Sequence, residues 1–176
     1  MVEVNHIYCP APREKWESIV FADPDSLTEH LPVWVDAICS YERSEDASRL
    51  YELDDGRSFV VPLVRRRIRY GPRMAYGHGW GIGGIVGPEL DAGVVELVLR
   101  DLAADDALYT HIRPNPLKAA IWQEADTSVA TSVPRRAHVL DLHGGPEATM
   151  QRFRKSGRTG IRRSGNKGVS VRVFCG

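Results

Sequence analysis

The stretch RLYELDDGRSFVVPLV, residues 49–64, decides the fold of this chain. Residues 49–53 and 58–64 are rich in aliphatic and aromatic side chains that favour strands, and Asp55-Gly56 joins the two runs. Asp-Gly between such runs is typical of a tight hairpin, in which both turn positions take positive φ. Pro62 cannot donate a hydrogen bond to a neighbouring strand, so we expect it at a sheet edge or a bulge. The stretch therefore predicts two antiparallel strands.

Helices are predicted on both sides of this hairpin. Residues 13–21 place Trp16 and Val20 on one helical face. Residues 32–41 begin with a proline, which suits the first turn of a helix. We expect further helices over 93–104 and 117–124, a glycine-rich loop over 77–87, and further strands over 65–70, 108–113, 137–142 and 168–174. Because helices and strands alternate in the second half, the sequence predicts an α/β fold with a mixed sheet.

Length and composition predict one globular domain over residues 1–176. The chain is 43% hydrophobic, which is enough for a substantial core. Its longest apolar runs, such as residues 59–64, are far shorter than the ~20 residues of a membrane span, and the first residues do not resemble a signal peptide. The three cysteines are scattered and have no metal-ligand spacing. We therefore expect a cytoplasmic protein with reduced thiols and no metal site.

Charge is distributed unevenly along the chain. The 23 basic and 23 acidic residues balance overall, but the last acidic residue is Glu147 and eight basic residues follow it. Residues 1–147 are therefore strongly acidic and residues 148–176 strongly basic. This asymmetry predicts either an anionic partner or a further piece of protein that meets the basic segment.

The basic segment is predicted to form one amphipathic helix from Pro146 onward. A narrow stripe of mostly apolar and small residues is expected to face inward: Met150, Phe153, Gly157, Ile161 and Ser164. Basic residues gather on another side, and four of them are our candidate anion-binding residues: Lys155, Arg158, Arg162 and Arg163. Two interpretations stay open, a solvated helix face and a site for phosphate, nucleic acid or an acidic protein surface. Few aromatic rings lie nearby for base stacking, which weakens an RNA-binding interpretation.

Other motifs in the sequence are weak. Gly79-Trp-Gly-Ile-Gly-Gly84 matches the dinucleotide fingerprint GxGxxG, but Pro88 follows where the helix of that motif should begin. We interpret this loop as a tight turn that lines a cleft. His138 and His143 flank Asp141 in a predicted strand, where the two imidazoles would point to opposite faces. The acidic pairs Asp54-Asp55 and Asp105-Asp106 are interpreted as turn and cap residues.

Several segments taken in order resemble a known family. They are residues 31–37 (LPVWVDA), 53–57 (LDDGR), 61–65 (VPLVR), 80–84 (WGIGG), 112–117 (IRPNPL), 138–142 (HVLDL) and the basic run 152–169. Together they resemble the Fem-type transferases, the FemA/FemB-like branch of the GNAT acyltransferase superfamily. The resemblance covers nearly all of this chain but only about half of such an enzyme, which has two GNAT-like halves.

The resemblance implies a GNAT-like mixed sheet with flanking helices, present as a single, incomplete copy that corresponds to the first half of the enzyme. That half helps to bind the amine acceptor, a small molecule or a peptide, and we assign no cofactor to it. The second half handles the donor, an acyl-CoA or an aminoacyl-tRNA. Our candidate substrate-binding residues are Trp34, Tyr76, His78, Trp80, Arg113 and Asn115. No catalytic base is assigned.

Three features depart from the family pattern. Asp36 and Ala37 stand where the peptidoglycan-bridge enzymes usually have a lysine, which weakens the case for a cell-wall precursor as acceptor. The superfamily's pyrophosphate signature, R/Q-x-x-G-x-G/A, is incomplete at both 154–159 and 162–167. The basic helix also contains glycines that weaken it unless it packs against something. We therefore expect a truncated protein, or one that pairs with a second GNAT-like half or another copy.

Two functional hypotheses follow. In the first, the chain is the acceptor-binding half of an N-acyltransferase, in which an amine attacks a thioester or ester carbonyl. Such a reaction needs a base and a donor that stabilises the oxyanion. In the second, the chain is a non-catalytic module whose basic helix binds nucleic acid or an acidic protein. A gene fragment without activity is a third possibility.

Overall fold

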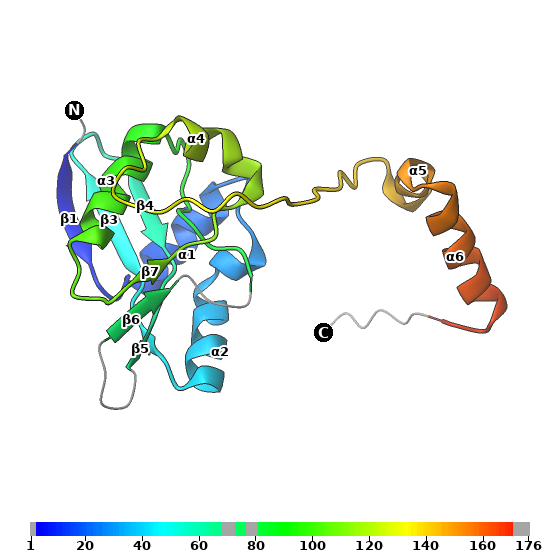
Figure 1. Ribbon diagram of the computed structural model, residues 1–176, viewed down its shortest axis with the longest axis horizontal. Coiled ribbons are helices and arrows are strands. Elements are labelled where there is room, and N and C mark those ends of the chain that lie inside the picture. Colours follow the sequence, from blue (N-terminus) through cyan, green and yellow to red (C-terminus); the bar gives the residue numbers. More distant parts are fainter. Residues whose placement is uncertain (1–2, 68–72, 77–80, 171–176) are drawn as a thin grey trace. The chain divides into compact units, whose positions relative to one another are not determined.

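The computed structural model describes residues 3–67, 73–76 and 81–170, without the side chains of residues 67 and 73–76. The chain forms two compact units, which we name unit 1 (residues 1–136) and unit 2 (residues 137–176). Unit 1 contains the strands and four α-helices, and unit 2 contains two further helices (Figure 1). The predicted α/β class is confirmed.

The predicted hairpin is present, with a different turn. Strands β3 (Arg49–Leu53) and β4 (Ser58–Val61) pair antiparallel. The Leu53 N–H donates to the Arg57 carbonyl at 2.9 Å, and Gly56 has φ 87° while Asp55 does not have positive φ. The loop therefore has three residues that end on a left-handed glycine, and the predicted two-residue turn is wrong.

Pro62 interrupts this strand pair without shifting its register. After Pro62 and Leu63 the second strand resumes as β5 (Val64–Arg67), which pairs antiparallel with β2 (Glu45–Asp46). The register is the same on both sides of the proline, because Glu45 lies opposite Arg65 and Arg49 lies opposite Val61. Between these pairs, the Ala47 N–H donates to the Leu63 carbonyl at 3.0 Å. The two ladders are therefore halves of one long strand pair, and Pro62 lies at the irregularity that its missing N–H predicts.

Three more strands complete the mixed arrangement. Strand β1 (Val4–Tyr8) pairs antiparallel with β3, and β6 (Arg73–Tyr76) pairs antiparallel with β5. Strand β7 (Thr110–His111) lies parallel to β6. The strands form a three-stranded sheet in the order β1-β3-β4 and a four-stranded sheet in the order β2-β5-β6-β7, which continues the first past Pro62.

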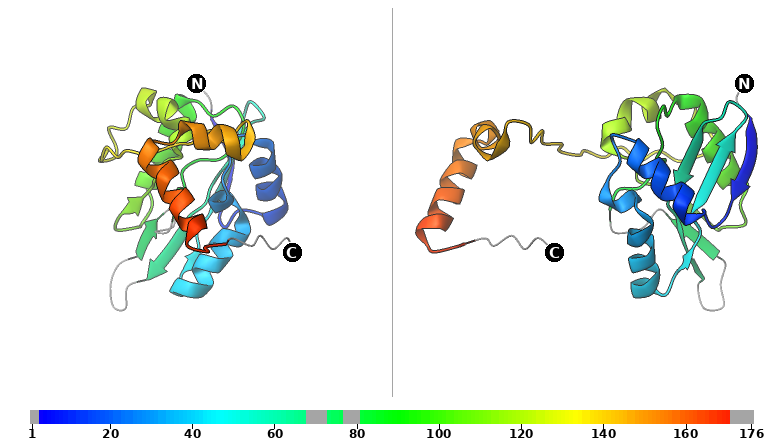
Figure 2. Two further views of the ribbon diagram at one scale, coloured as in Figure 1. Left: turned by 90° about the vertical axis from the view of Figure 1, so that its right-hand side faces the viewer. Right: turned by 180° about the vertical axis from the view of Figure 1, so that it is seen from behind.

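Helices cover both faces of these strands. Helix α3 (Ala92–Ala103) connects β6 to β7 and packs on one face, against a cluster that includes Tyr51 and Phe59. Helices α1 (Arg13–Ala22) and α2 (Pro32–Glu42) pack on the other face, against a cluster that includes Leu50 and Val60 (Figure 2). Neighbouring strand residues enter different clusters because successive side chains point to opposite faces. The remaining elements of unit 1 are the short 3₁₀ helices η1 (Thr28–His30) and η2 (Pro116–Lys118) and helix α4 (Ala119–Glu124).

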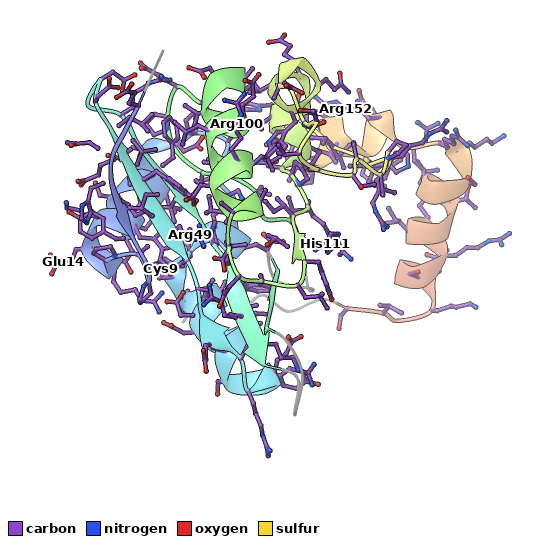
Figure 3. All side chains as sticks on the ribbon, turned by 60° about the vertical axis from the view of Figure 1, so that its left-hand side comes forward. Cys9, Glu14, Arg49, Arg100, His111 and Arg152 are labelled. Carbon is purple, nitrogen blue, oxygen red and sulfur yellow. The ribbon has the colours of Figure 1, made fainter. Side chains whose placement is uncertain are left out.

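A partly buried ion network joins α3 to the strands. Asp105 is 8% exposed and pairs with Arg49 and Arg65, and Asp101 accepts from the Tyr51 hydroxyl at 2.7 Å. Figure 3 shows Arg49 at this position among the strands and α3. Burial, together with this hydrogen bond to Asp101, raises the pKa of Tyr51. Asp105 lies in the bend after α3, as we expected of a turn residue, but its carboxylate also neutralises arginines that lie far away in the sequence.

The predictions for the last third of the chain need correction. Residues 137–142 form no strand, residues 108–113 contribute only the two residues of β7, and most of the predicted strand 168–174 lies outside the described residues. The single predicted basic helix is two helices, α5 (Gly145–Arg152) and α6 (Lys155–Asn166). The break occurs at Phe153, whose φ of −72° and ψ of 145° are extended.

The apolar stripe that we expected to face inward in this segment is not buried. No residue of α5 or α6 is buried, and Ile161 is 47% exposed. In the described part of the chain, no helix is both long and apolar enough to cross a membrane.

We predict that Gly87 is far less replaceable than Gly56, although both have positive φ. A Cβ on Gly87 would lie 2.6 Å from the Phe59 ring and 2.8 Å from the Ser58 carbonyl oxygen, whereas a Cβ on Gly56 meets nothing within 4 Å. Gly87→Ala should lower the free energy of unfolding by about 3 kcal/mol and Gly56→Ala by about 1 kcal/mol. Urea denaturation measures both values. Equal losses would contradict the close packing of Gly87.

Candidate functional site

The parallel strands β6 and β7 place two chain segments at one edge of the sheet. Tyr76, the last residue of β6, lies opposite His111, the last residue of β7. His111 is exposed at this end (Figure 3). Ligands of α/β sheets bind beyond the carboxyl ends of parallel strands. In the sequence, residues 77–87 follow β6 and residues 112–117 follow β7, so this end of the two strands is the candidate site.

The two segments are tied together closely. The Gly83 N–H donates to the Arg113 carbonyl at 2.8 Å. Gly84 has φ 99°, and a Cβ there would lie 3.2 Å from the Cα of Pro114. Only glycine lets the backbones approach this closely in that conformation. The described part of the glycine-rich loop, residues 81–87, is thus packed closely against the segment 113–114.

The buried side chain of His30 fixes the backbone of this loop at Gly83. Its Nδ1 accepts from the Leu27 N–H at 3.0 Å, so its Nε2 carries the proton and donates to the Gly83 carbonyl at 3.2 Å. The Trp16 indole N–H donates to the His30 carbonyl at 2.8 Å. His30 is 1% exposed, and burial lowers the pKa of its imidazole, against opposing contributions from the Gly83 hydrogen bond and the carboxylates of Asp23 and Glu29. The imidazole therefore fixes the loop as a neutral group.

A buried ion pair holds the far end of the same loop. Lys118 Nζ lies 2.5 Å from Asp23 Oδ2 and donates to the Gly87 carbonyl at 3.0 Å. The Gly87 N–H donates to the same Asp23 oxygen at 2.8 Å. The two side chains are 6% and 1% exposed. Both polar groups of the Gly87 backbone are therefore satisfied by one ion pair, which fixes where the loop ends.

The structure places the candidate substrate-binding residues in different settings. Asn115 is buried and fully engaged, because its amide N–H donates to the Asp25 carbonyl at 2.7 Å and its oxygen accepts from the Leu117 N–H at 3.0 Å. Arg113 is half-buried beside Gly83. Trp34 packs in the cluster under α1 and α2, and its buried indole N–H has no hydrogen-bond partner among the described residues. The side chain of Tyr76 and all of His78 and Trp80 lie outside the described part of the chain.

Sequence reasoning missed Glu29. This half-buried residue lies in η1, directly beside the glycine-rich loop, where a Cβ on Gly81 would come within 2.9 Å of its Cγ. The carboxylate forms no hydrogen bond or ion pair with another described residue. No motif marks Thr28-Glu29-His30, since its importance depends on packing against a segment about 50 residues later. Glu29 is thus a carboxylate beside the glycine-rich loop with no basic partner among the described residues.

The N-terminus of α3, the helix that follows the glycine-rich loop, is already capped by a carboxylate. Asp91 caps α3 by accepting from the Val94 N–H at 2.9 Å, and Arg57 donates to the other oxygen of Asp91 at 2.6 Å. These contacts lower the pKa of Asp91, against the effect of its partial burial. A pyrophosphate would have to displace this carboxylate from the helix start.

The candidate anion-binding residues lie in unit 2. Lys155, Arg162 and Arg163 are exposed on α6, and Arg158 is half-exposed, with its guanidinium donating to the Gln151 carbonyl at 3.2 Å. Among the described residues none of the four pairs with a carboxylate, whereas Arg152 lies 3.4 Å from Asp141. In the described ranges no three His, Cys, Asp or Glu side chains gather as metal ligands would.

Comparison with known proteins returned no family model, no curated protein and no solved structure that matches this chain.

Acid should weaken unit 1 through His30. Because the folded protein favours neutral imidazole, the unfolded chain binds more protons once the pH falls below the ordinary value of about 6.5, and the free energy of unfolding then decreases. His30→Gln, whose amide can make both hydrogen bonds, should flatten this dependence between pH 7 and about 5. Urea titrations at several pH values measure it. The exposed His6 is the control, and a His6→Gln variant that flattens the slope equally would contradict the assignment.

Loss of the Lys118 ammonium should cost far more than loss of a surface lysine. Lys118→Met leaves the Asp23 carboxylate buried without its counter-ion, and we expect about 3 kcal/mol less free energy of unfolding. Lys15→Met removes a lysine whose partner Glu52 lies 2.6 Å away in a pair that water reaches, and it should change stability little. Thermal and urea unfolding of both variants test the difference. Similar stability of the two variants would show that the buried pair does not hold the loop.

Proposed function

We propose that unit 1 is the acceptor-binding part of a GNAT-like N-acyltransferase. In the proposed reaction, the acceptor's amine nitrogen forms a bond to the acyl carbon. The bond from that carbon to the donor's sulfur or oxygen breaks, and the amine loses a proton to a base. A second GNAT-like half or another copy supplies the donor site, which takes an acyl-CoA or an aminoacyl-tRNA.

The arrangement of the parallel strands β6 and β7 is the observation that carries the proposal. Helix α3 connects the two strands, and the segments that resemble Fem-type transferases, 80–84 and 112–117, follow their carboxyl ends. A mixed sheet with helices on both faces is also what the resemblance implies. The capped start of α3 supports an acceptor site rather than a donor site, since Asp91 occupies the position that a pyrophosphate would need.

Glu29 supplies the chemistry that an amine acceptor requires. Its carboxylate lies against Gly81 at the candidate site and is not neutralised by a described basic residue. A carboxylate accepts charge-assisted hydrogen bonds from an ammonium, and these are stronger than neutral ones. In the proposed complex Glu29 binds the acceptor's amine beside the loop, close to the segment that carries Arg113.

Binding of amines to the isotope-labelled chain tests this proposal by NMR. A lysine-containing tripeptide should shift the amide signals of Gly81, Gly83 and Gly84. Its N-acetylated counterpart should bind about tenfold more weakly, because it lacks the cationic amines. Glu29→Gln should weaken binding of the free amine by a similar factor.

The matched control is Glu14→Gln, which removes an exposed carboxylate of α1. This variant should bind the tripeptide as the unmodified chain does. Equal binding of the acetylated and free peptides, or signal changes confined to α1, would refute an amine site at the glycine-rich loop.

A further inference from the structure

Unit 2 has a charge excess that its own residues cannot neutralise. It contains eight basic residues and only two acidic ones, Asp141 and Glu147, while unit 1 contains fifteen basic and twenty-one acidic residues. Asp141 is already engaged, because it accepts from the His143 imidazole at 2.9 Å and lies near Arg152. Glu147 forms no ion pair with α6 among the described residues, so the cations of this helix lack a carboxylate partner there.

The cations of α6 form a continuous stripe. Lys155, Arg158 and Arg162 follow one another at intervals of three and four residues, which places them on one side of the helix along roughly 10 Å of its axis. Arg163 extends the stripe at its edge. The hydroxyls of Thr159 and Ser164 do not contribute to it, since they donate to carbonyls four residues earlier in the helix.

This helix has little to stabilise it in the free protein. Gly157, Gly160 and Gly165 each disfavour the helical state, and like charges at Arg158 and Arg162 repel one another one turn apart. No residue of α6 is buried, so packing does not compensate. An anionic partner would remove the repulsion and stabilise the helix at the same time.

The composition of the surface favours a nucleic acid over a protein as that partner. Protein interfaces have a core that is depleted of charge and enriched in apolar and aromatic groups, and Ile161 is the only large apolar side chain on α6. Interfaces with nucleic acids are more polar and much more positively charged. Arginine, which predominates here, pairs with phosphate through two parallel hydrogen bonds.

We propose that α6 binds the phosphodiester backbone of nucleic acid without reading its sequence, and that binding orders the helix. The contacts come from Lys155, Arg158, Arg162 and Arg163. Base stacking contributes little, because the described part of unit 2 offers only Phe153 as an aromatic ring besides its two histidines. This activity is independent of an amine site in unit 1.

Fluorescence anisotropy with a labelled oligouridylate and the full chain tests the proposal. Affinity should fall as salt rises, and the triple variant R158Q/R162Q/R163Q should bind about a hundredfold more weakly at 0.1 M salt, with a logarithmic salt slope smaller by about 2. The matched control is R43Q/R66Q/R100Q, which removes the same charge from exposed arginines of unit 1 and should bind as the unmodified chain does. Equal loss in both variants would overturn the assignment to α6.

Two further measurements separate this proposal from its rivals. Poly-glutamate at equal charge should compete weakly, and competition equal to that of the RNA would replace the proposal with an acidic protein partner. Gly160 and Gly165 have open space around them, so G160A/G165A should favour the helix and tighten RNA binding about fivefold. Unchanged affinity would show that the helix is already formed before binding and would overturn the coupled ordering.

Discussion

The missing N–H of Pro62 determines where the candidate site forms. The long strand pair runs in one register from Glu45 to Leu53, but Pro62 cannot continue the ladder on the outer side of its strand. Before the proline, Val60 exchanges two backbone hydrogen bonds of 2.9 Å with Val86; after it, Val64 pairs with Tyr76. The chain between Tyr76 and Val86 therefore leaves this strand and returns to it within one interruption. The described end of the glycine-rich loop, residues 81–87, therefore returns to this strand before the interruption, and Gly83 lies beside Arg113, which follows β7.

A loop placed in this way leaves backbone polar groups in the interior, and unit 1 satisfies them with side chains from distant elements. His30 donates a hydrogen bond to the Gly83 carbonyl. Asp23 accepts from the Gly87 N–H, and Lys118 donates to the Gly87 carbonyl. A buried ion pair adds little net stability compared with apolar packing, because both charges must leave water. Its value here is geometric: each partner also binds the Gly87 backbone, so the loop has one position in which all four groups are satisfied. The described end of the loop is therefore held by three side chains that lie far from it in the sequence.

Sequence periodicity predicted the elements that depend on local patterns. Helices α1, α2 and α3 follow from apolar residues at helical spacing, and the strand pair follows from its β-rich runs around Gly56. Strand formation at 137–142 was predicted wrongly because HVLDL has strand propensity, but a strand also needs a partner edge, which a single segment cannot reveal. The contacts at the candidate site could not be predicted either, because a local pattern does not reveal partners that are distant in the sequence. Asp23 and Lys118, for example, lie 95 positions apart. No sequence pattern marked Glu29 as a site residue, because a single carboxylate in a short 3₁₀ helix is common in proteins.

Basic side chains are paired with carboxylates in unit 1 but lack such partners on α6 in unit 2, among the described residues. In unit 1, folding brings carboxylates to arginines from more than 30 positions away, as Asp91 to Arg57 and Asp105 to Arg49, and the arginines then hold strands and helices together. In unit 2 the stripe on α6 meets no carboxylate among the described residues, and it opposes the helix that carries it. Charge that stabilises no contact and disfavours its own helix contributes nothing to the fold of that segment. This is the physical basis of our proposal that the stripe binds a polyanion, which would neutralise it and remove the repulsion within the helix.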